Sequence, residues 1–177
     1  EYDVPHHPDR HVTPGSAAGG PGSFFIRTND GAKTFRVMET PAGDPSRANW
    51  KEIIPARVDV TIESVSAFRG RLVTEERHRG LIQIHIRALG TGAAHAIEFP
   101  EPAYAASLGP NAEFDTNILR FGYASLVTPA SVFDYDMEAH TRELKKRQPV
   151  LGGYDPSNYA CERLFAKAPD GVADVIE

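Results

Sequence analysis

The feature that most constrains this chain is a strand–turn–strand unit that occurs three times at constant spacing. The units are SFFIRTNDGAKTFRVMET at 23–40, RLVTEERHRGLIQIHIRAL at 71–89 and ILRFGYASLVTPASVFDYDM at 118–137. Their first strands begin near Phe24, Arg71 and Ile118, a step of 47 residues both times. A repeat of this length predicts an array of similar structural units that pack on one another.

Further strands complete each unit. A short strand ending in proline follows each one, as KEIIP at 51–55, AIEFP at 96–100 and LKKRQP at 144–149. Another strand precedes the second and third units, at 57–68 and 102–108. Four antiparallel strands in each step are the design of a β-propeller blade, whose two faces are covered by neighbouring blades.

Alternation with a period of two supports these strands. In 81–89, isoleucines alternate with Gln83, His85 and Arg87, which is typical of a half-buried strand. In 57–68 the apolar residues Val58, Val60 and Ile62 alternate with Asp59, Thr61 and Glu63, and the phase slips at Ser64. The slip predicts a β-bulge. Residues 137–146 fit strand, turn and strand better than helix, so almost no helix is expected.

Composition bounds the class of protein. With 177 residues the chain is long enough for one domain, and its 15 Gly and 14 Pro predict many turns, including a Gly/Pro-rich loop at 13–23. The net charge is −5, with 19 basic and 24 acidic residues mixed along the chain, which argues against nucleic-acid and membrane partners. No signal peptide is recognisable, and the single Cys161 cannot form an internal disulfide, so a reducing compartment fits.

We therefore predict an all-β fold, a partial β-propeller of about three four-stranded antiparallel blades in a single domain. Blade-like repeats are expected at about 24–57, 58–102 and 103–149, with 150–177 leaving the last blade. A β-sandwich also contains many short strands. The propeller is favoured because sandwiches rarely repeat the same order of strands, turns and prolines at constant spacing.

Several segments resemble one known family. FFIRTNDGAKTFRV, LVTEERHRGL, LRFGYASLVTP and the closing YDPSNYACERLFAKAPDGV at 154–172 are similar to the later propeller blades of oligopeptidase B-type enzymes, in the prolyl oligopeptidase family of serine peptidases. The likeness runs from about Phe24 to Val172. Two departures are the length of the loop at 13–23 and the final ADVIE, which is not expected to continue into the strand that normally follows DGV.

The resemblance implies a seven-bladed propeller that caps an α/β-hydrolase domain and admits short peptides, which are cleaved after Arg or Lys. This chain would supply the last blades, filter substrates by size and gate access to an active site outside it. Its partners would be the catalytic domain of the same parent chain and short basic peptides, in the cytoplasm or alternatively the periplasm. The rival function is a β-propeller interaction scaffold without peptidase activity.

The chain itself is expected to be inactive, because it contains no G-x-S-x-G nucleophile motif. The nearest string, GYASL at 122–126, lacks the second glycine, so its Ser125 is interpreted as a blade residue. Cys161 is interpreted as a small buried side chain rather than a reactive thiol. An incomplete propeller should also expose apolar faces on its end blades, which predicts that the isolated chain self-associates.

The remaining polar residues give one weak site hypothesis. If 58–63 is an innermost strand, Asp59 and Glu63, with Thr61 between them, are candidates to line the substrate channel; ordinary solvated strand residues are the alternative. His6, His7 and His11 are interpreted as solvated, and exposure is expected to explain His78 and His85, so no metal or cofactor is predicted. The basic residues at 142–147 are interpreted as a solvated edge strand, namely Arg142, Lys145, Lys146 and Arg147.

Overall fold

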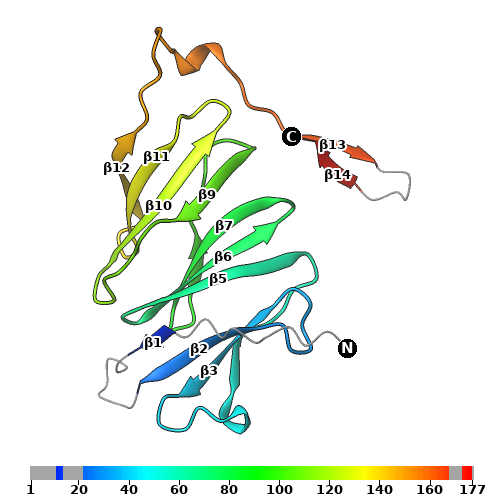
Figure 1. The fold of residues 1–177 in the computed structure, drawn as a ribbon, viewed down its shortest axis with the longest axis vertical. Helices are drawn as coiled ribbons and strands as arrows, with labels where there is room; N and C mark the ends of the chain where they lie inside the picture. Colours follow the sequence, from blue (N-terminus) through cyan, green and yellow to red (C-terminus); the bar gives the residue numbers. More distant parts are fainter. Residues whose placement is uncertain (1–10, 14–21, 168–172, 177) are drawn as a thin grey trace.

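The chain folds into three four-stranded antiparallel sheets followed by a two-stranded hairpin. This is seen in a computed structural model that describes residues 11–13, 22–167 and 173–176. The sheets are stacked along the long axis of the molecule (Figure 1). Within the described residues the helical segments are two short 3-10 turns, Arg47–Asn49 and Pro156–Asn158, and no helix could span a membrane. The predicted all-β partial propeller with almost no helix is confirmed.

Blade A is the first sheet, with strands in the order β1 (His11–Thr13), β2 (Ser23–Thr28), β3 (Arg36–Pro41) and β4 (Lys51–Ile54). Its strand β1 lies before the first sequence repeat and pairs antiparallel with β2. The predicted loop at 13–23 therefore joins two strands of one sheet, and its residues 14–21 lie outside the described part of the chain.

Blade B is the second sheet, in the order β5 (Val60–Phe68), β6 (Arg71–His78), β7 (Leu81–Ala88) and β8 (Ala94–Ala96). The register of β5 on β6 shifts between Ile62 and Ser64, so the predicted bulge is confirmed. Arg79 and Gly80, which join β6 to β7, have φ angles of 49° and 84°. Positive φ at both positions is the two-residue hairpin turn that matches the twist of paired strands.

Two expectations for blade B are wrong. Val58 is 99% exposed, because an isolated bridge between Arg57 and Val60 closes a turn and the buried strand begins only at Val60. The last strand, β8, ends at Ala96 instead of beginning there. Beyond it, the backbone N–H of Ile97 still donates to the carbonyl of Ile84 at 2.9 Å, and the chain then leaves the sheet.

Blade C is the third sheet, with β9 (Tyr104–Leu108), β10 (Ile118–Ser125), β11 (Ser131–Asp136) and β12 (Thr141–Arg147). The predicted strand, turn and strand around 137–146 is confirmed, and every residue of the basic edge strand β12 is exposed. The chain ends in the hairpin β13 (Leu164–Lys167) and β14 (Ala173–Ile176). Because β14 includes most of ADVIE, the expectation that no strand follows DGV is wrong.

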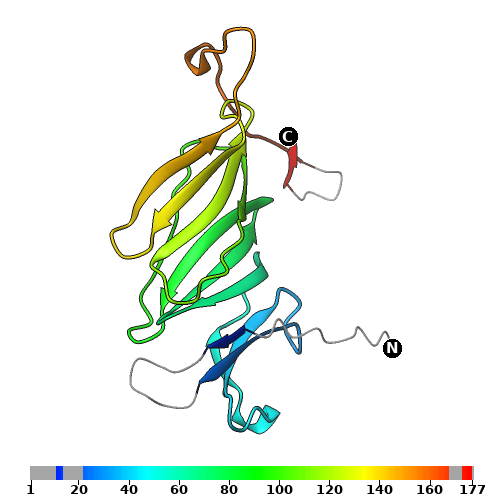
Figure 2. The same cartoon turned by 60° about the vertical axis from the view of Figure 1, so that its left-hand side comes forward.

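Both faces of blade B are buried, because side chains alternate along each strand. Leu72 packs with Phe25 and Val37 of blade A, whereas the next residue, Val73, packs with Leu119 and other residues of blade C. Burial of each such side chain contributes roughly 1.5–3 kcal/mol. The turned view in Figure 2 shows the sheets facing one another in this way. The blades thus shield each other's apolar faces, as a propeller requires.

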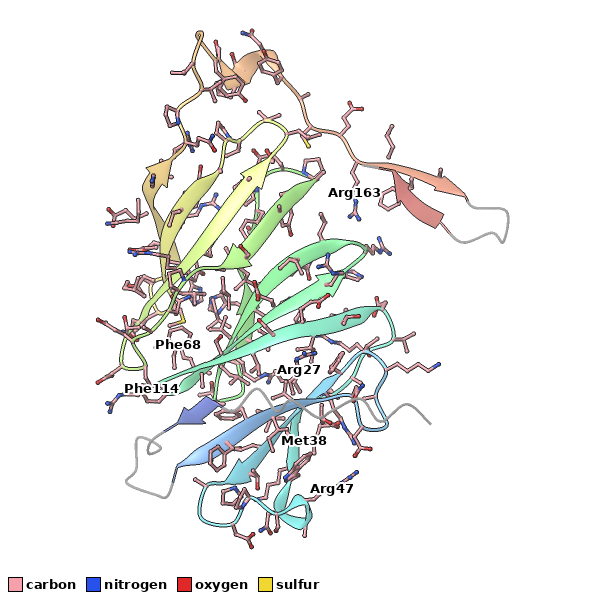
Figure 3. The ribbon with its side chains drawn as sticks, viewed as in Figure 1. Arg27, Met38, Arg47, Phe68, Phe114 and Arg163 are labelled. Carbon is pink, nitrogen blue, oxygen red and sulfur yellow. The ribbon has the colours of Figure 1, made fainter. Side chains whose placement is uncertain are left out.

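Polar contacts also cross both blade boundaries. Between blades A and B, the N–H of Ile62 donates to the carbonyl of Thr34 at 3.0 Å, and Arg27 Nη1 donates to the Ile62 carbonyl at 3.1 Å. Between blades B and C, the N–H of Arg69 donates to the carbonyl of Phe114 at 2.9 Å. Figure 3 labels Arg27 and Phe114 at these two boundaries. Such bonds fix how one sheet lies on the next.

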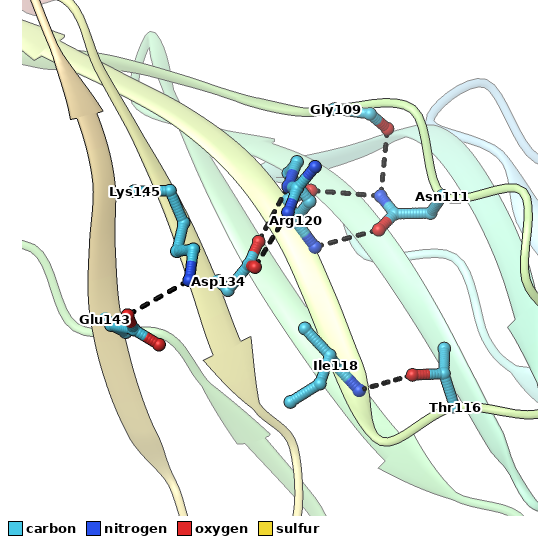
Figure 4. Close-up of polar contacts among 8 residues, drawn as sticks. All are labelled: Gly109, Asn111, Thr116, Ile118, Arg120, Asp134, Glu143 and Lys145. Carbon is cyan, nitrogen blue, oxygen red and sulfur yellow. Dashed lines mark hydrogen bonds and ion pairs between the residues drawn. The ribbon is translucent and has the colours of Figure 1, made fainter.

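The outer face of blade C is not a bare apolar surface. Arg120 Nε and Nη2 donate to the two carboxylate oxygens of Asp134 at 2.7 and 2.8 Å, and Lys145 pairs with Glu143 at 3.0 Å (Figure 4). The hydrogen bonds from Arg120 lower the pKa of Asp134. The premise that both end blades expose apolar faces is therefore wrong for blade C.

The outer face of blade A is largely covered by its own chain. Ile26 and Met38 are 9% and 8% exposed although they lie opposite the residues that pack on blade B. Thr40 on the same face is fully buried, and its hydroxyl donates to the carbonyl of Asp44 in the loop after β3 at 3.4 Å. Self-association of the isolated chain remains a prediction. The outer faces of blades A and C expose less apolar surface to drive it than the sequence analysis assumed.

Candidate functional site

One end of blades B and C is contacted by the segment that leaves the last blade, residues 150–167, which we call the return segment. Its Tyr154 hydroxyl donates to the carbonyl of Val127 in the β10–β11 turn. The half-buried Cys161 thiol donates to the carbonyl of Ala103 at 3.4 Å. Further along, Arg163 lies beside the β6–β7 turn, where a Cβ added to Gly80 would be 3.4 Å from Nη2. We call this the return-segment end.

The two channel candidates lie on blade B at this same end, and each has its own partner. Asp59, in the turn before β5, has its carboxylate 3.2 Å from Nε2 of His78. Glu63, in β5, accepts a hydrogen bond at 2.7 Å from Arg77, which also donates to the carbonyl of Gly80. They do not form a joined acidic pair. Because Arg77 offsets the charge of Glu63, Asp59 is the stronger source of negative potential.

The other residues considered from sequence have ordinary surroundings. Ser125 closes the β10–β11 turn, where its hydroxyl oxygen accepts from the N–H groups of Val127 and Thr128 at 3.0 and 2.7 Å. His11 lies in β1, opposite Phe25, whereas His6 and His7 lie outside the described residues. Within the described part of the chain, no group of three or more His, Cys, Asp or Glu side chains is placed to hold a metal ion.

Sequence reasoning missed the buried carboxylate of Glu76, which is 3% exposed at the centre of blade B. Glu76 pairs with Arg57 from the linker between blades A and B, and it accepts a hydrogen bond from Thr74 at 2.8 Å. The signal was present in the alternation of β6, because Glu76 shares a face with the buried Leu72 and Thr74. Burying a carboxylate requires such partners.

His85 belongs to this cluster, so simple exposure does not explain it. Its side chain is 28% exposed and Nε2 lies 3.5 Å from the Glu76 carboxylate. Burial lowers the pKa of His85, while the charge of Glu76 acts in the opposite direction. The neighbouring Glu75 points to the other face, where it accepts from the N–H of Leu108 in blade C at 2.7 Å. The adjacent carboxylates of Glu75 and Glu76 thus form hydrogen bonds at opposite boundaries of blade B, with blade C and with the A–B linker respectively.

A groove of about 290 Å³ opens between the return segment and the end of blade C. Its lining includes Tyr104, Ala105, Ala124, Leu126, Glu162 and Arg163. The Nε and Nη2 atoms of Arg163 are buried, and among the described residues they have no hydrogen-bond partner. Burial raises the pKa of Tyr104, with the charge of Arg163 acting against that shift. The groove combines a small apolar lining with the partly buried side chain of Arg163.

Comparison with known proteins identifies the family of this chain. Residues 16–148 match the family described as prolyl oligopeptidase, N-terminal beta-propeller domain. The chain is 35% identical over 176 residues to a dipeptidyl aminopeptidase BI from Pseudoxanthomonas mexicana and 29% identical over 172 residues to a protease 2 from Moraxella lacunata. These alignments cover 99% and 97% of the chain, which spans 22% of each relative's length.

Solved structures agree with the fold. Oligopeptidase B from Trypanosoma brucei, in a closed form with covalently bound antipain, is 27% identical with a TM-score of 0.76. Oligopeptidase B from Leishmania major is 28% identical with a TM-score of 0.75. Each comparison covers 93% of this chain and 24% of the solved chain. With its three mutually shielding blades and its match to the propeller family, this chain belongs to the prolyl oligopeptidase family, as a segment of the N-terminal β-propeller domain.

Proposed function

We propose that this chain is the blade segment of a serine oligopeptidase, in which it filters substrates by size and gates access to an active site outside it. The observation that carries the proposal is the return segment, which lies across one end of blades B and C. A catalytic domain that follows it would sit at that end, over Asp59 and Glu63. Every polypeptide substrate would then pass the same blade ends.

The packing supports a filter. Blade B is covered on both faces, and hydrogen bonds cross both boundaries, so the three blades form one stiff wall. A stiff wall admits a chain only through a fixed opening or by rigid-body movement against the catalytic domain. Short peptides would pass, and folded proteins would not.

Preference for Arg or Lys before the cleaved bond is the finer part of the proposal. The Asp59 carboxylate is 72% exposed, so it attracts basic peptides over roughly a Debye length, ~8 Å. In the full-length parent, we expect Asp59→Asn to raise KM for a basic peptide severalfold with little change in kcat, and to leave KM for a neutral peptide unchanged. An equal change for both peptides would contradict steering by this charge.

The decisive experiment uses the full-length parent protein. Its reading frame after this segment must encode a G-x-S-x-G turn with later Asp and His. The purified enzyme should hydrolyse N-terminally blocked arginyl and lysyl peptide amides faster than prolyl ones, and should leave folded proteins intact. A parent without the motif and without activity would support an interaction scaffold instead.

A second candidate activity is removal of dipeptides from free N-termini. It is favoured by the 35% identical relative that is named a dipeptidyl aminopeptidase. Blocking the N-terminus of the same arginyl substrate distinguishes the two activities. An endopeptidase of short peptides retains its rate on the blocked substrate, whereas a dipeptidyl aminopeptidase loses nearly all of it.

The isolated chain gives two further tests. It should not hydrolyse arginyl or lysyl peptides, because no nucleophile motif is present in its sequence. Light scattering at increasing concentration tests self-association. A monomer at every concentration would show that the outer faces of blades A and C are sufficiently covered, whereas activity that survives repurification would overturn the assignment.

A further inference from the structure

We propose that Glu101 positions the return segment on the end of blade C and, through it, the catalytic domain of the parent, so that the size filter depends on this residue. The part that concerns the catalytic domain and the filter rests on the proposed function. The attachment of the return segment rests on the contacts of this chain alone.

The return segment is attached to blade C at two points. Between 148 and 160 every side chain is exposed except that of Tyr154, and the next partly buried one is Cys161. The Tyr154 hydroxyl donates to the carbonyl of Val127, and the Cys161 thiol donates to the carbonyl of Ala103. A groove of about 380 Å³ lies beside the first contact, and Figure 2 shows the segment projecting beyond the end of blade C. We call the two accepting carbonyls the anchor carbonyls.

Both anchor carbonyls lie just beyond the end of one strand ladder. The ladder of β9 and β10 ends at the pair of Tyr104 and Ser125, so Ala103 and Val127 are not members of it. The β10–β11 turn keeps its own shape, because the Ser125 hydroxyl oxygen accepts from the N–H groups of Val127 and Thr128. The position of one anchor carbonyl relative to the other therefore depends on a further contact between the turn and the B–C linker, residues 97–103.

Glu101 makes this contact. It lies in the B–C linker and is partly buried. The hydroxyl of Tyr123 donates to one oxygen of its carboxylate, and the hydroxyls of Ser125, at 3.3 Å, and Thr128 donate to the other. Hydrogen bonds to a carboxylate are stronger than those between neutral groups. One side chain thus joins the linker, which carries one anchor carbonyl, to the turn, which carries the other.

The consequence concerns the tether between the blades and the domain that would follow them. When Glu101 is lost, the two anchor carbonyls move independently, and Tyr154 and Cys161 no longer hold the return segment in one place. A catalytic domain joined to this segment would then move more freely against the blades. The opening for substrates would widen, and longer peptides would enter.

Limited proteolysis of this chain by chymotrypsin measures the attachment. Cleavage after Tyr154 requires this side chain to leave its contact, so the rate follows the population of released segment. Glu101→Gln removes the charge and one acceptor oxygen, and should speed the cleavage roughly tenfold. The matched control is Glu98→Gln, which removes the same charge from an exposed position of the B–C linker and should leave the rate unchanged. Thermal unfolding of both variants establishes that the blades remain folded.

Further variants separate positioning from a general loss of packing. Thr128→Val removes a hydroxyl that donates to Glu101 and should speed cleavage, whereas Thr128→Ser keeps a hydroxyl and should cleave slowly. Tyr154→Phe removes the first contact but leaves a residue after which chymotrypsin cleaves. Adding Glu101→Gln to Tyr154→Phe should give little further increase, because both changes release the same contact.

The full-length parent tests the link to the size filter. Glu101→Gln should raise kcat/KM severalfold for a long basic peptide relative to a short one with the same cleavage site. Glu98→Gln should leave this ratio unchanged, because its side chain is exposed in the same linker.

Equal cleavage rates in the Glu101 and Glu98 variants would overturn the positioning role, as would independent, multiplying effects of Glu101→Gln and Tyr154→Phe. An active parent whose ratio of long to short peptides is unchanged by Glu101→Gln would overturn the link to the filter. A parent without peptidase activity would overturn the proposed function and that link together, whereas the attachment of the return segment is decided by the proteolysis of this chain.

Discussion

The two blade boundaries solve the same packing problem with different residues. The boundary between blades B and C has the larger core cluster, which is rich in aromatic side chains. Phe121 stacks on Phe133 with ring centroids 5.4 Å apart, and Phe99 contacts Phe121 edge-on with centroids 5.8 Å apart. The boundary between blades A and B has a smaller, mainly aliphatic cluster beside the pair of buried Glu76 and partly exposed Arg57. We infer that the first is held chiefly by packing and the second depends more on charge.

The largest expected effect breaks the aromatic boundary. Phe121 is fully buried, so Phe121→Ala should lower the free energy of unfolding by about 3–5 kcal/mol. Phe25→Ala, at the 1% exposed position in the other boundary, should cost less, because ring pairing adds about 0.5–1.5 kcal/mol to Phe121. Chemical denaturation measures both. A larger loss for Phe25→Ala would reverse the comparison.

The second effect tests charge at the A–B boundary. Glu76→Gln should lower the free energy of unfolding by about 1–3 kcal/mol, a figure reduced from that for fully buried pairs because the Arg57 side chain is 40% exposed. The matched control is Glu63→Gln, whose pair with Arg77 is exposed on both sides and should contribute less than about 1 kcal/mol. Equal losses would show that burial of Glu76 adds nothing.

A third, smaller effect concerns pH and one histidine at each boundary. Burial is the main cause that lowers the pKa of both His85, beside Glu76, and His95, whose ring stacks on His140 of blade C at 3.8 Å. The folded state then binds fewer protons than the unfolded state, whose histidines titrate near ~6.5. Stability is full above that pH and falls as the pH drops toward the lowered values.

Histidine variants check this sign. His85→Gln and His95→Gln should each flatten the fall in unfolding free energy between about pH 7.5 and pH 5, measured by chemical denaturation around the reference value of ~6.5. If the unfolding free energy of these variants falls with pH as steeply as that of the unchanged chain, other groups cause the pH dependence.

The smallest effect is expected on the outer face of blade C, where no other blade packs in this chain. Arg120→Ala removes the exposed pair with Asp134, and the resulting change in unfolding free energy should shrink further as salt is added. A loss as large as that of Glu76→Gln, unaffected by salt, would show that this face contributes to stability as much as the buried boundary does.

Local pattern predicted most of the fold. Alternation in β5 and β7 placed Ile62, Ile84 and Ile86 in the cores, and the phase slip gave the bulge. Prediction from local pattern failed where the structure depends on residues distant in sequence or on very short segments. Strand β1 has three residues and becomes a strand only by pairing with β2, and Val58 continues the alternation but lies in a turn.

The site was harder to predict for the same reason. Asp59 and Glu63 could be proposed from one strand, but their partners His78 and Arg77 come from the end of the next strand. Burial of Glu76 depends on Arg57 in a linker, and burial of the Arg163 guanidinium nitrogens depends on the return segment lying against the β6–β7 turn. A single local pattern contains none of these contacts.

The alternation of Leu72 and Val73 between opposite cores limits how this family of chains can change in length. Inserting one residue into the middle of β6 would move each later side chain to the opposite face, so Glu75 and Glu76 would exchange boundaries together. Gains and losses of residues should therefore accumulate in the hairpin turns and linkers. Comparing gap positions among related sequences would reveal a central strand of fixed length between connections of variable length.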